Sequence, residues 1–140
     1  MAAKEKILVP VDGSENSDRA VRFAIDLLHG GTLHLVNVQP SLGGAARMFV
    51  RKADVEAFHR EEGEKALASA LKLAAEAGAK AEKHISVGRP GEVIAHYAKK
   101  LGAKMIVMGT RGHTGLAGVA LGSVAQDVIA RSDAPVCLVK

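Results

Sequence analysis

The chain has 140 residues and a mass of 14.6 kDa, so we expect a single domain over residues 1–140 instead of a multidomain enzyme. Apolar residues make up 48% and charged residues 24%, a composition that excludes a disordered chain. The formal net charge is +4, the basic residues form no run, and aromatic residues make up 3%. With neither a basic stripe nor aromatic side chains for base stacking, we expect no nucleic-acid partner.

Cysteine content and the apolar runs indicate the compartment. Cys137 is the single cysteine, which excludes an intrachain disulfide and a multi-cysteine metal site and favours a reducing cytoplasm. The first apolar run, residues 7–11, is too short for the core of a signal peptide. No window approaches the ~18 apolar residues of a membrane span. We therefore expect a cytoplasmic protein without a membrane segment.

The first predicted strand is residues 7–11, a continuous apolar run that precedes an Asp-Gly turn. Such a run is typical of a strand buried on both faces. Pro10 cannot donate to a sheet ladder, so we expect it where pairing stops. Ser14 is a good helix N-cap, and apolar residues at helical spacing predict a helix that ends before Gly30.

The middle of the chain predicts a second strand over residues 32–38 and a loop over residues 39–53. A long helix is expected from Asp54 to a stop at Gly78. Residues 80–87 predict a third strand in which successive side chains alternate between the two faces. Only part of this strand can be buried, which indicates a peripheral position in the sheet.

The last third predicts a helix that ends at Gly102, a doubly buried strand over residues 105–108, a helix from about Ser123 and a final strand over residues 136–139. Five strands thus alternate with four helices. Strict alternation implies parallel strands joined by right-handed crossovers, hence a three-layer α/β sandwich with a five-stranded parallel sheet.

Glycines cluster between the fourth predicted strand and the last helix. They are Gly109, Gly112, Gly115, Gly118 and Gly122. Glycine lets backbone approach a ligand closely, and a helix N-terminus attracts anions. Ligands in open α/β sheets bind at the carboxyl ends of the strands, where Asp12, Val38 and Gly109 are expected to emerge. The pattern favours an anion site, while a flexible surface loop before a helix capped by Ser123 stays open as the alternative.

The glycines do not form a Walker A loop, because no Gly-Lys-Ser/Thr follows them. The sequence Gly109-Thr110-Arg111-Gly112, nine further residues and then Gly122-Ser123 resembles the ATP-binding signature of the universal stress proteins. The similarity extends from residues 7–14 through residues 87–90 to residues 135–139. The resemblance implies the ATP-binding branch of that family and a Rossmann-like fold of the adenine nucleotide alpha hydrolase type.

The resemblance also implies where the nucleotide lies. Asp12 would contact the ribose or adenosine, the backbone at Val38 the adenine, and the Ser123 hydroxyl a terminal phosphate, with Mg²⁺ accompanying the phosphates. Backbone N–H groups of residues 109–112 and 122–124 would hold the phosphates, with Arg111 close by. The cofactor-binding residues so expected are Pro10, Val11, Asp12, Val38, Met108, Gly109, Arg111, Gly112, Gly122, Ser123 and Val124.

The remaining candidate side chains give weaker indications of function. The six histidines include no His-x-x-x-His pair on a helix, so we expect no metal ligands, and we expect no catalytic residues. Cys137 lies in an apolar strand, where packing explains it. The final strand, Val136 to Val139, would leave a bare hydrophobic edge if unpaired, and the resemblance suggests a homodimer through it.

The function we expect is that of an ATP-binding module in a stress response. Slow ATP hydrolysis, or phosphoryl transfer to Ser123, is the enzymatic alternative, although no general base is evident. Product formation faster than about 1 per second per site would exclude the binding module. A nucleotide-free interaction scaffold is the third hypothesis.

Overall fold

The computed structural model describes residues 5–43, 50–110 and 121–140. They form one parallel five-stranded sheet of order β3-β2-β1-β4-β5. The elements are β1 (Lys6–Pro10), α1 (Glu15–Leu27), β2 (Thr32–Gln39), α3 (Lys52–Glu76), β3 (Lys80–Val87), α4 (Pro90–Leu101), β4 (Met105–Gly109), α5 (Ser123–Arg131) and β5 (Val136–Val139). The predicted α/β fold is confirmed, and β3 lies at a sheet edge as expected. Within these residues no helix is both long and apolar enough to cross a membrane.

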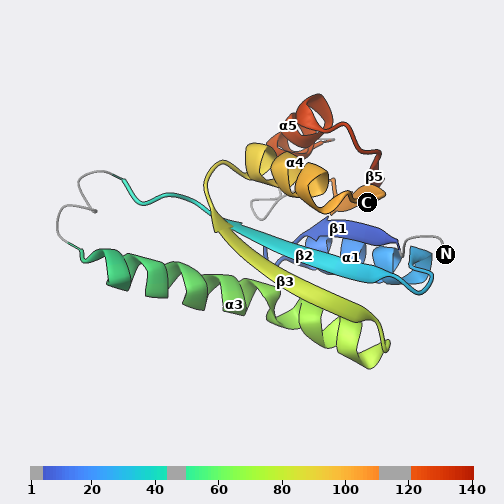
Figure 1. The fold of residues 1–140 in the computed structure, drawn as a ribbon, viewed down its shortest axis with the longest axis horizontal. Coiled ribbons are helices and arrows are strands. Elements are labelled where there is room, and N and C mark those ends of the chain that lie inside the picture. Colours follow the sequence, from blue (N-terminus) through green and yellow to red (C-terminus); the bar gives the residue numbers. More distant parts are fainter. Residues whose placement is uncertain (1–4, 44–49, 111–120) are drawn as a thin grey trace.

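Helices cover both faces of the sheet, with α1 and α3 on one face and α4 and α5 on the other (Figure 1). Strand β1 shows why the first apolar run is unbroken. Ile7 and Val9 pack in the core under α1 and α3, while Leu8 packs in the core under α4 and α5. Side chains of a strand alternate between the faces, so a central strand between two helical layers has to be apolar at every position.

Pro10 sits where one of its two neighbouring strands is no longer paired. The N–H of Val11 donates to the oxygen of Val36 on β2 over 2.8 Å. Since successive residues direct their backbone groups to opposite sides, the nitrogen of Pro10 faces β4. The pairing of β1 with β4 covers Ile7 and Leu8 and stops before Pro10. The proline therefore removes no ladder hydrogen bond, as the sequence led us to expect.

Helix boundaries follow the predictions with one shift. The Oγ of Ser14 accepts from the N–H of Ser17 over 3.3 Å and caps α1. Helix α3 begins at Lys52, two residues before the expected Asp54, although no side chain caps it. Its first turn is closed by the oxygen of Arg51, which accepts from the N–H of Asp54 over 3.0 Å. Residues 44–49 of the predicted loop lie outside the described residues.

Gly31 allows β2 to pass against the start of β1. A Cβ built there would lie 2.0 Å from the oxygen of Glu5, the same oxygen that accepts from the N–H of Thr32 over 2.8 Å. The Glu5 oxygen in the clash belongs to backbone that its hydrogen bond with Thr32 holds in place. The close approach fixes the register of β1 against β2 and hence the level at which both strands end.

We predict that Gly31→Ala lowers the free energy of unfolding by about 1–3 kcal/mol, because the added methyl overlaps backbone that cannot move without breaking the β1–β2 ladder. Urea denaturation of both proteins measures the difference. Gly43→Ala is the matched control, since its Cβ would meet no described atom within 4 Å. A Gly31→Ala protein as stable as this control would contradict the prediction.

Candidate functional site

A cavity opens at the carboxyl ends of β1, β2 and β4. Its walls are formed by Pro10, Val11, Asp12, Ser17, Val36, Asn37, Val38, Pro90, Ile94, Met108, Gly109, Thr110, Gly122, Val124 and Ala125. The sheet order places β1 beside both β2 and β4, so the strand order reverses at this point. In open α/β sheets such a reversal leaves a crevice, because the chain leaves the two strands toward opposite faces.

The structure brings most of the predicted site residues to this cavity. Those in its wall are Pro10, Val11, Asp12, Val38, Met108, Gly109, Gly122 and Val124. Ser123 is exposed at the first position of α5 and does not line the cavity. Arg111 and Gly112 lie outside the described residues. Asn37 and Ser17 line the cavity without having been predicted from the sequence, and Thr110, which also lines it, lies in the predicted range 109–112.

Asp12 lies two residues after the end of β1, and a tight turn holds its carboxylate. The N–H of Ser14 donates to Oδ1 of Asp12 over 2.9 Å. Gly13 between them has φ +83°, a left-handed conformation that a residue with a side chain rarely adopts. One carboxylate oxygen is thus fixed by the turn, and a carboxylate retains further lone pairs to accept from a ligand hydroxyl.

Asn37 ties the ends of two strands together. Its side chain is buried, and Nδ2 donates to the oxygen of Val11 over 2.8 Å. Its Oδ1 accepts from Nε2 of Gln39 over 2.6 Å. The oxygen of Gln39 in turn accepts from the N–H of Gly88 over 3.0 Å, at the turn into α4. A polar residue inside the apolar run of β2 was the sequence feature that could have identified it.

Backbone hydrogen bonds hold Thr110, at the end of β4, and Gly122, at the start of α5. The N–H of Thr110 donates to the oxygen of Val139 over 3.1 Å, and the N–H of Gly122 donates to the oxygen of Thr110 over 2.6 Å. Helix α5 therefore begins beside the end of β4. Residues 111–120 between these two points lie outside the described residues.

The N-terminus of α5 presents backbone donors. Gly122 is its N-cap residue, and among the described residues no side chain makes a capping hydrogen bond. The first helical bond runs from the N–H of Gln126 to the oxygen of Gly122 over 3.1 Å. The N–H groups of residues 123–125 precede that bond, and Val124 and Ala125 line the cavity. Such a helix end favours a bound anion through these donors and the helix dipole.

The cavity wall thus combines three kinds of group: a carboxylate acceptor, backbone N–H donors and apolar side chains. A carboxylate acceptor, Asp12, and the first residues of α5 line the same cavity. Apolar side chains, including Val36, Ile94 and Met108, also line it and belong to the core under α4 and α5. This arrangement suits a ligand that combines hydroxyl groups, an apolar ring and an anionic group.

We predict that Asn37→Leu lowers the free energy of unfolding by about 1–3 kcal/mol, because the buried oxygen of Val11 loses its side-chain donor. Thermal or urea unfolding measures the loss. Gln39→Leu is the control: it removes only the outer bond of the same chain, at a half-buried position, and we expect less than half the effect. Equal losses in the two variants would show that the Val11 contact is not the important one.

Comparisons with known proteins agree over the whole length of the chain. The family model described as the universal stress protein family matches residues 4–140. Universal stress protein MJ0531 of Methanocaldococcus jannaschii is 36% identical, over 97% of this chain and 82% of its own length. Universal stress protein YxiE of Bacillus subtilis is 35% identical, over 96% of this chain and 98% of its own length.

Solved structures give the same result. MJ0577, the subject of a structure-based assignment of biochemical function, superposes with a TM-score of 0.85 at 30% identity, covering 99% of this chain and 97% of its own. A universal stress protein in complex with cAMP has a TM-score of 0.75 at 29% identity, covering 99% of each chain. The Archaeoglobus fulgidus protein in complex with dAMP has a TM-score of 0.70 at 28% identity, covering 100% of each chain. The chain therefore belongs to the universal stress protein family.

Proposed function

We propose that this protein is a cytoplasmic, nucleotide-dependent module of a stress response that binds ATP in the cavity at the β1–β4 crevice. The observation that carries the proposal is that the Asp12 carboxylate and the N-terminus of α5, which no side chain of the described residues caps, line one cavity. Hydroxyl acceptor and anion donors belong to separate segments of the chain, and both line the cavity. The alternative of a surface loop that only precedes a capped helix would not explain why the Asp12 carboxylate lines the same cavity.

The residues present fit an adenine nucleotide. Asp12 would accept from the ribose hydroxyls, and the backbone at Val38 would contact the adenine beside the apolar wall. Of the expected backbone donors 122–124, the N–H of Gly122 already donates to the oxygen of Thr110. The N–H groups of Ser123 and Val124 would therefore hold phosphate oxygens, with the Ser123 hydroxyl on a terminal phosphate. Residues 109–112, including Arg111 and Gly112, would complete the phosphate cradle. Mg²⁺ would be held by the phosphates and water, as it commonly is at nucleotide sites.

Two related structures support the choice of an adenine nucleotide. They hold cAMP and dAMP in proteins 29% and 28% identical to this chain. Both ligands contain an adenine base, a sugar and a phosphate, the three parts for which this cavity has matching groups. ATP adds two phosphates, which extend toward the glycines between β4 and α5.

We predict that Asp12→Ala weakens the binding of Mg·ATP about tenfold to a hundredfold, since hydrogen bonds to a charged acceptor contribute about 1.5–3 kcal/mol. Calorimetric titration of protein purified free of nucleotide measures the affinity. Asp26→Ala removes a carboxylate from the exposed side of α1 and is expected to bind as the unaltered protein does. Gly122→Leu tests the other end of the cavity: Gly122 has φ −65°, so leucine fits the backbone while blocking the approach of phosphate.

Two results would contradict the proposal. One is a folded protein that does not bind Mg·ATP, cAMP or dAMP at millimolar concentration. The other is binding that Asp12→Ala and Gly122→Leu leave unchanged. Either result would favour the nucleotide-free scaffold.

We further propose that the protein forms a homodimer through β5. This strand pairs with β4 on one side and lies at the edge of the sheet, and Leu138 is 37% exposed. An apolar edge strand with free backbone groups is a template for pairing with a second copy.

Light scattering after gel filtration is expected to give the mass of a dimer, and Leu138→Asp to give a monomer, because a carboxylate in a buried strand pair is costly. Val87→Asp, at the opposite edge of the sheet, is the control and should remain dimeric. A monomeric unaltered protein would contradict the proposed homodimer. A dimer that only Val87→Asp disrupts would show that the contact lies at the β3 edge and not at β5.

A further inference from the structure

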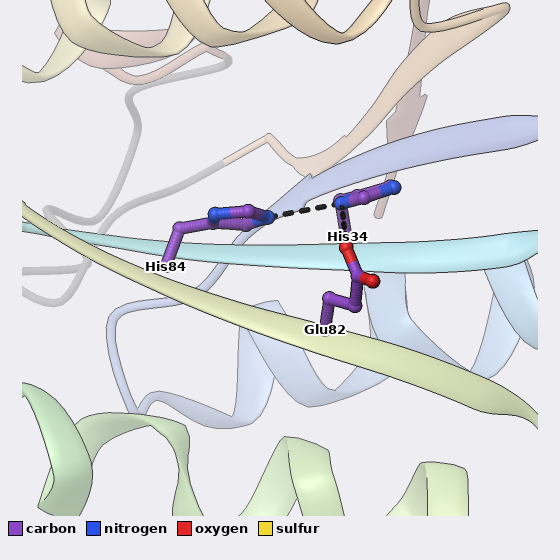
Figure 2. Close-up of side chains that lie close together, drawn as sticks. All are labelled: His34, Glu82 and His84. Carbon is purple, nitrogen blue, oxygen red and sulfur yellow. Dashed lines mark hydrogen bonds and ion pairs between the residues drawn. The ribbon is translucent and has the colours of Figure 1, made fainter.

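Three side chains that commonly bind metals converge on β2 and β3, outside the nucleotide cavity (Figure 2). They are His34 from β2 and Glu82 and His84 from β3. Parallel pairing sets His34 opposite Glu82 and Val36 opposite His84. Residues two apart on a strand share a face, so all three side chains project from the same side of the sheet. This is the α4 side, because the rings of His84 and Tyr97 are 5.2 Å apart.

The distances between the three groups are those of a coordination site. Nδ1 of His34 lies 2.9 Å from Nε2 of His84 and 3.4 Å from Oε2 of Glu82. One ligand atom from each residue lies within 4.8 Å of the others. Tetrahedral ligands at a Zn–N distance of about 2.0–2.1 Å are separated by about 3.3 Å. A small adjustment of His84 and Glu82 would therefore place one ion among all three atoms.

Hydrogen bonds alone satisfy this cluster poorly. Nδ1 of His34 holds at most one proton, which cannot give well-aligned bonds to both His84 and Glu82. Nε2 of His34 is buried without a partner among the described residues, so the ring meets these groups only through Nδ1. Two imidazole nitrogens and a carboxylate oxygen thus converge with too few protons between them. A cation would satisfy all three lone pairs at once.

The protonation state and access of the cluster are favourable as well. Burial lowers the pKa of His34 and of His84 below the ordinary value, and the charge of Glu82 offsets this only in part. The imidazoles are therefore neutral near pH 7, the form that binds metals. The side chain of His34 is 4% exposed, but that of Glu82 is 55% exposed and gives the ion a path from solvent. Over the part of the chain that the structure describes, Glu82 has no Lys or Arg in an ion pair.

We propose that His34, Glu82 and His84 bind one divalent transition-metal ion of the Zn²⁺ class, with water completing the coordination. Two imidazoles and a carboxylate form the same kind of ligand set as the His₂Glu sites of zinc proteins. The ion would join β2 to the edge strand β3. This site is separate from any Mg²⁺ bound with nucleotide phosphates and does not depend on nucleotide binding.

The test is a calorimetric titration with ZnCl₂ of untagged, chelator-treated, nucleotide-free protein. One ion per chain and a higher melting temperature with zinc are expected, because a ligand that binds the folded state stabilises it. His84→Ala should weaken binding at least about a hundredfold, since even outer-shell substitutions cost about 10–100-fold. Glu82→Gln, at an exposed position, should weaken it at least about tenfold and tests the site without disturbing the core. His96→Ala, an exposed histidine on α4, is the matched control and should bind as before.

The absorption of Co²⁺ in place of zinc gives a second readout, since its visible bands report a four-coordinate site with imidazole ligands. The proposal is overturned if the protein binds no zinc. It is also overturned if His84→Ala and Glu82→Gln both retain full affinity, or if His96→Ala loses as much as they do. Each of these outcomes is independent of whether ATP binds.

Discussion

The arrangement of this protein depends on where the pairing between β1 and β4 stops. Both strands are central and buried on both faces, so along their length they have room only for apolar side chains. Polar chemistry is confined to the points at which the chain leaves the sheet. Since the β1–β4 ladder ends before Pro10, the two strands end in a crevice. Pro10, which has no N–H to leave unsatisfied, is suited to that position.

Ending a ladder inside a molecule leaves backbone groups that need partners. The side of β1 that faces β2 is completed by the N–H of Val11, which donates to Val36, and by Asn37, which donates to the oxygen of Val11. Without Asn37, that oxygen would be buried and unpaired. The same side chain therefore maintains the end of β1 and sets the position of the turn that carries Asp12. The hydrogen bond from Asn37 to the oxygen of Val11 therefore contributes both to stability and to the geometry of the site.

The sequence predicted the fold well because apolar periodicity and glycine stops report local structure, which each segment carries by itself. It also indicated why Pro10 is tolerated in β1. It did not reveal Asn37 or the cluster of His34 with Glu82 and His84, because both depend on register. Which residue of β3 lies opposite His34 is decided by the register of the β2–β3 ladder, which is not visible as a motif. A search for histidine pairs along helices could not find a cluster formed across two strands.

The same crevice gives a binding module a physical means of responding to its ligand. From β1 the chain passes through Asp12 into α1 on one face of the sheet, and from β4 it passes through Gly122 into α5 on the other face. A ligand held by both ends would connect the two helical layers on the opposite faces of the sheet. Its binding free energy would then stabilise one relative position of those layers over others. If the protein binds a nucleotide as proposed above, a nucleotide that spans the cavity would therefore act on both α1 and α5.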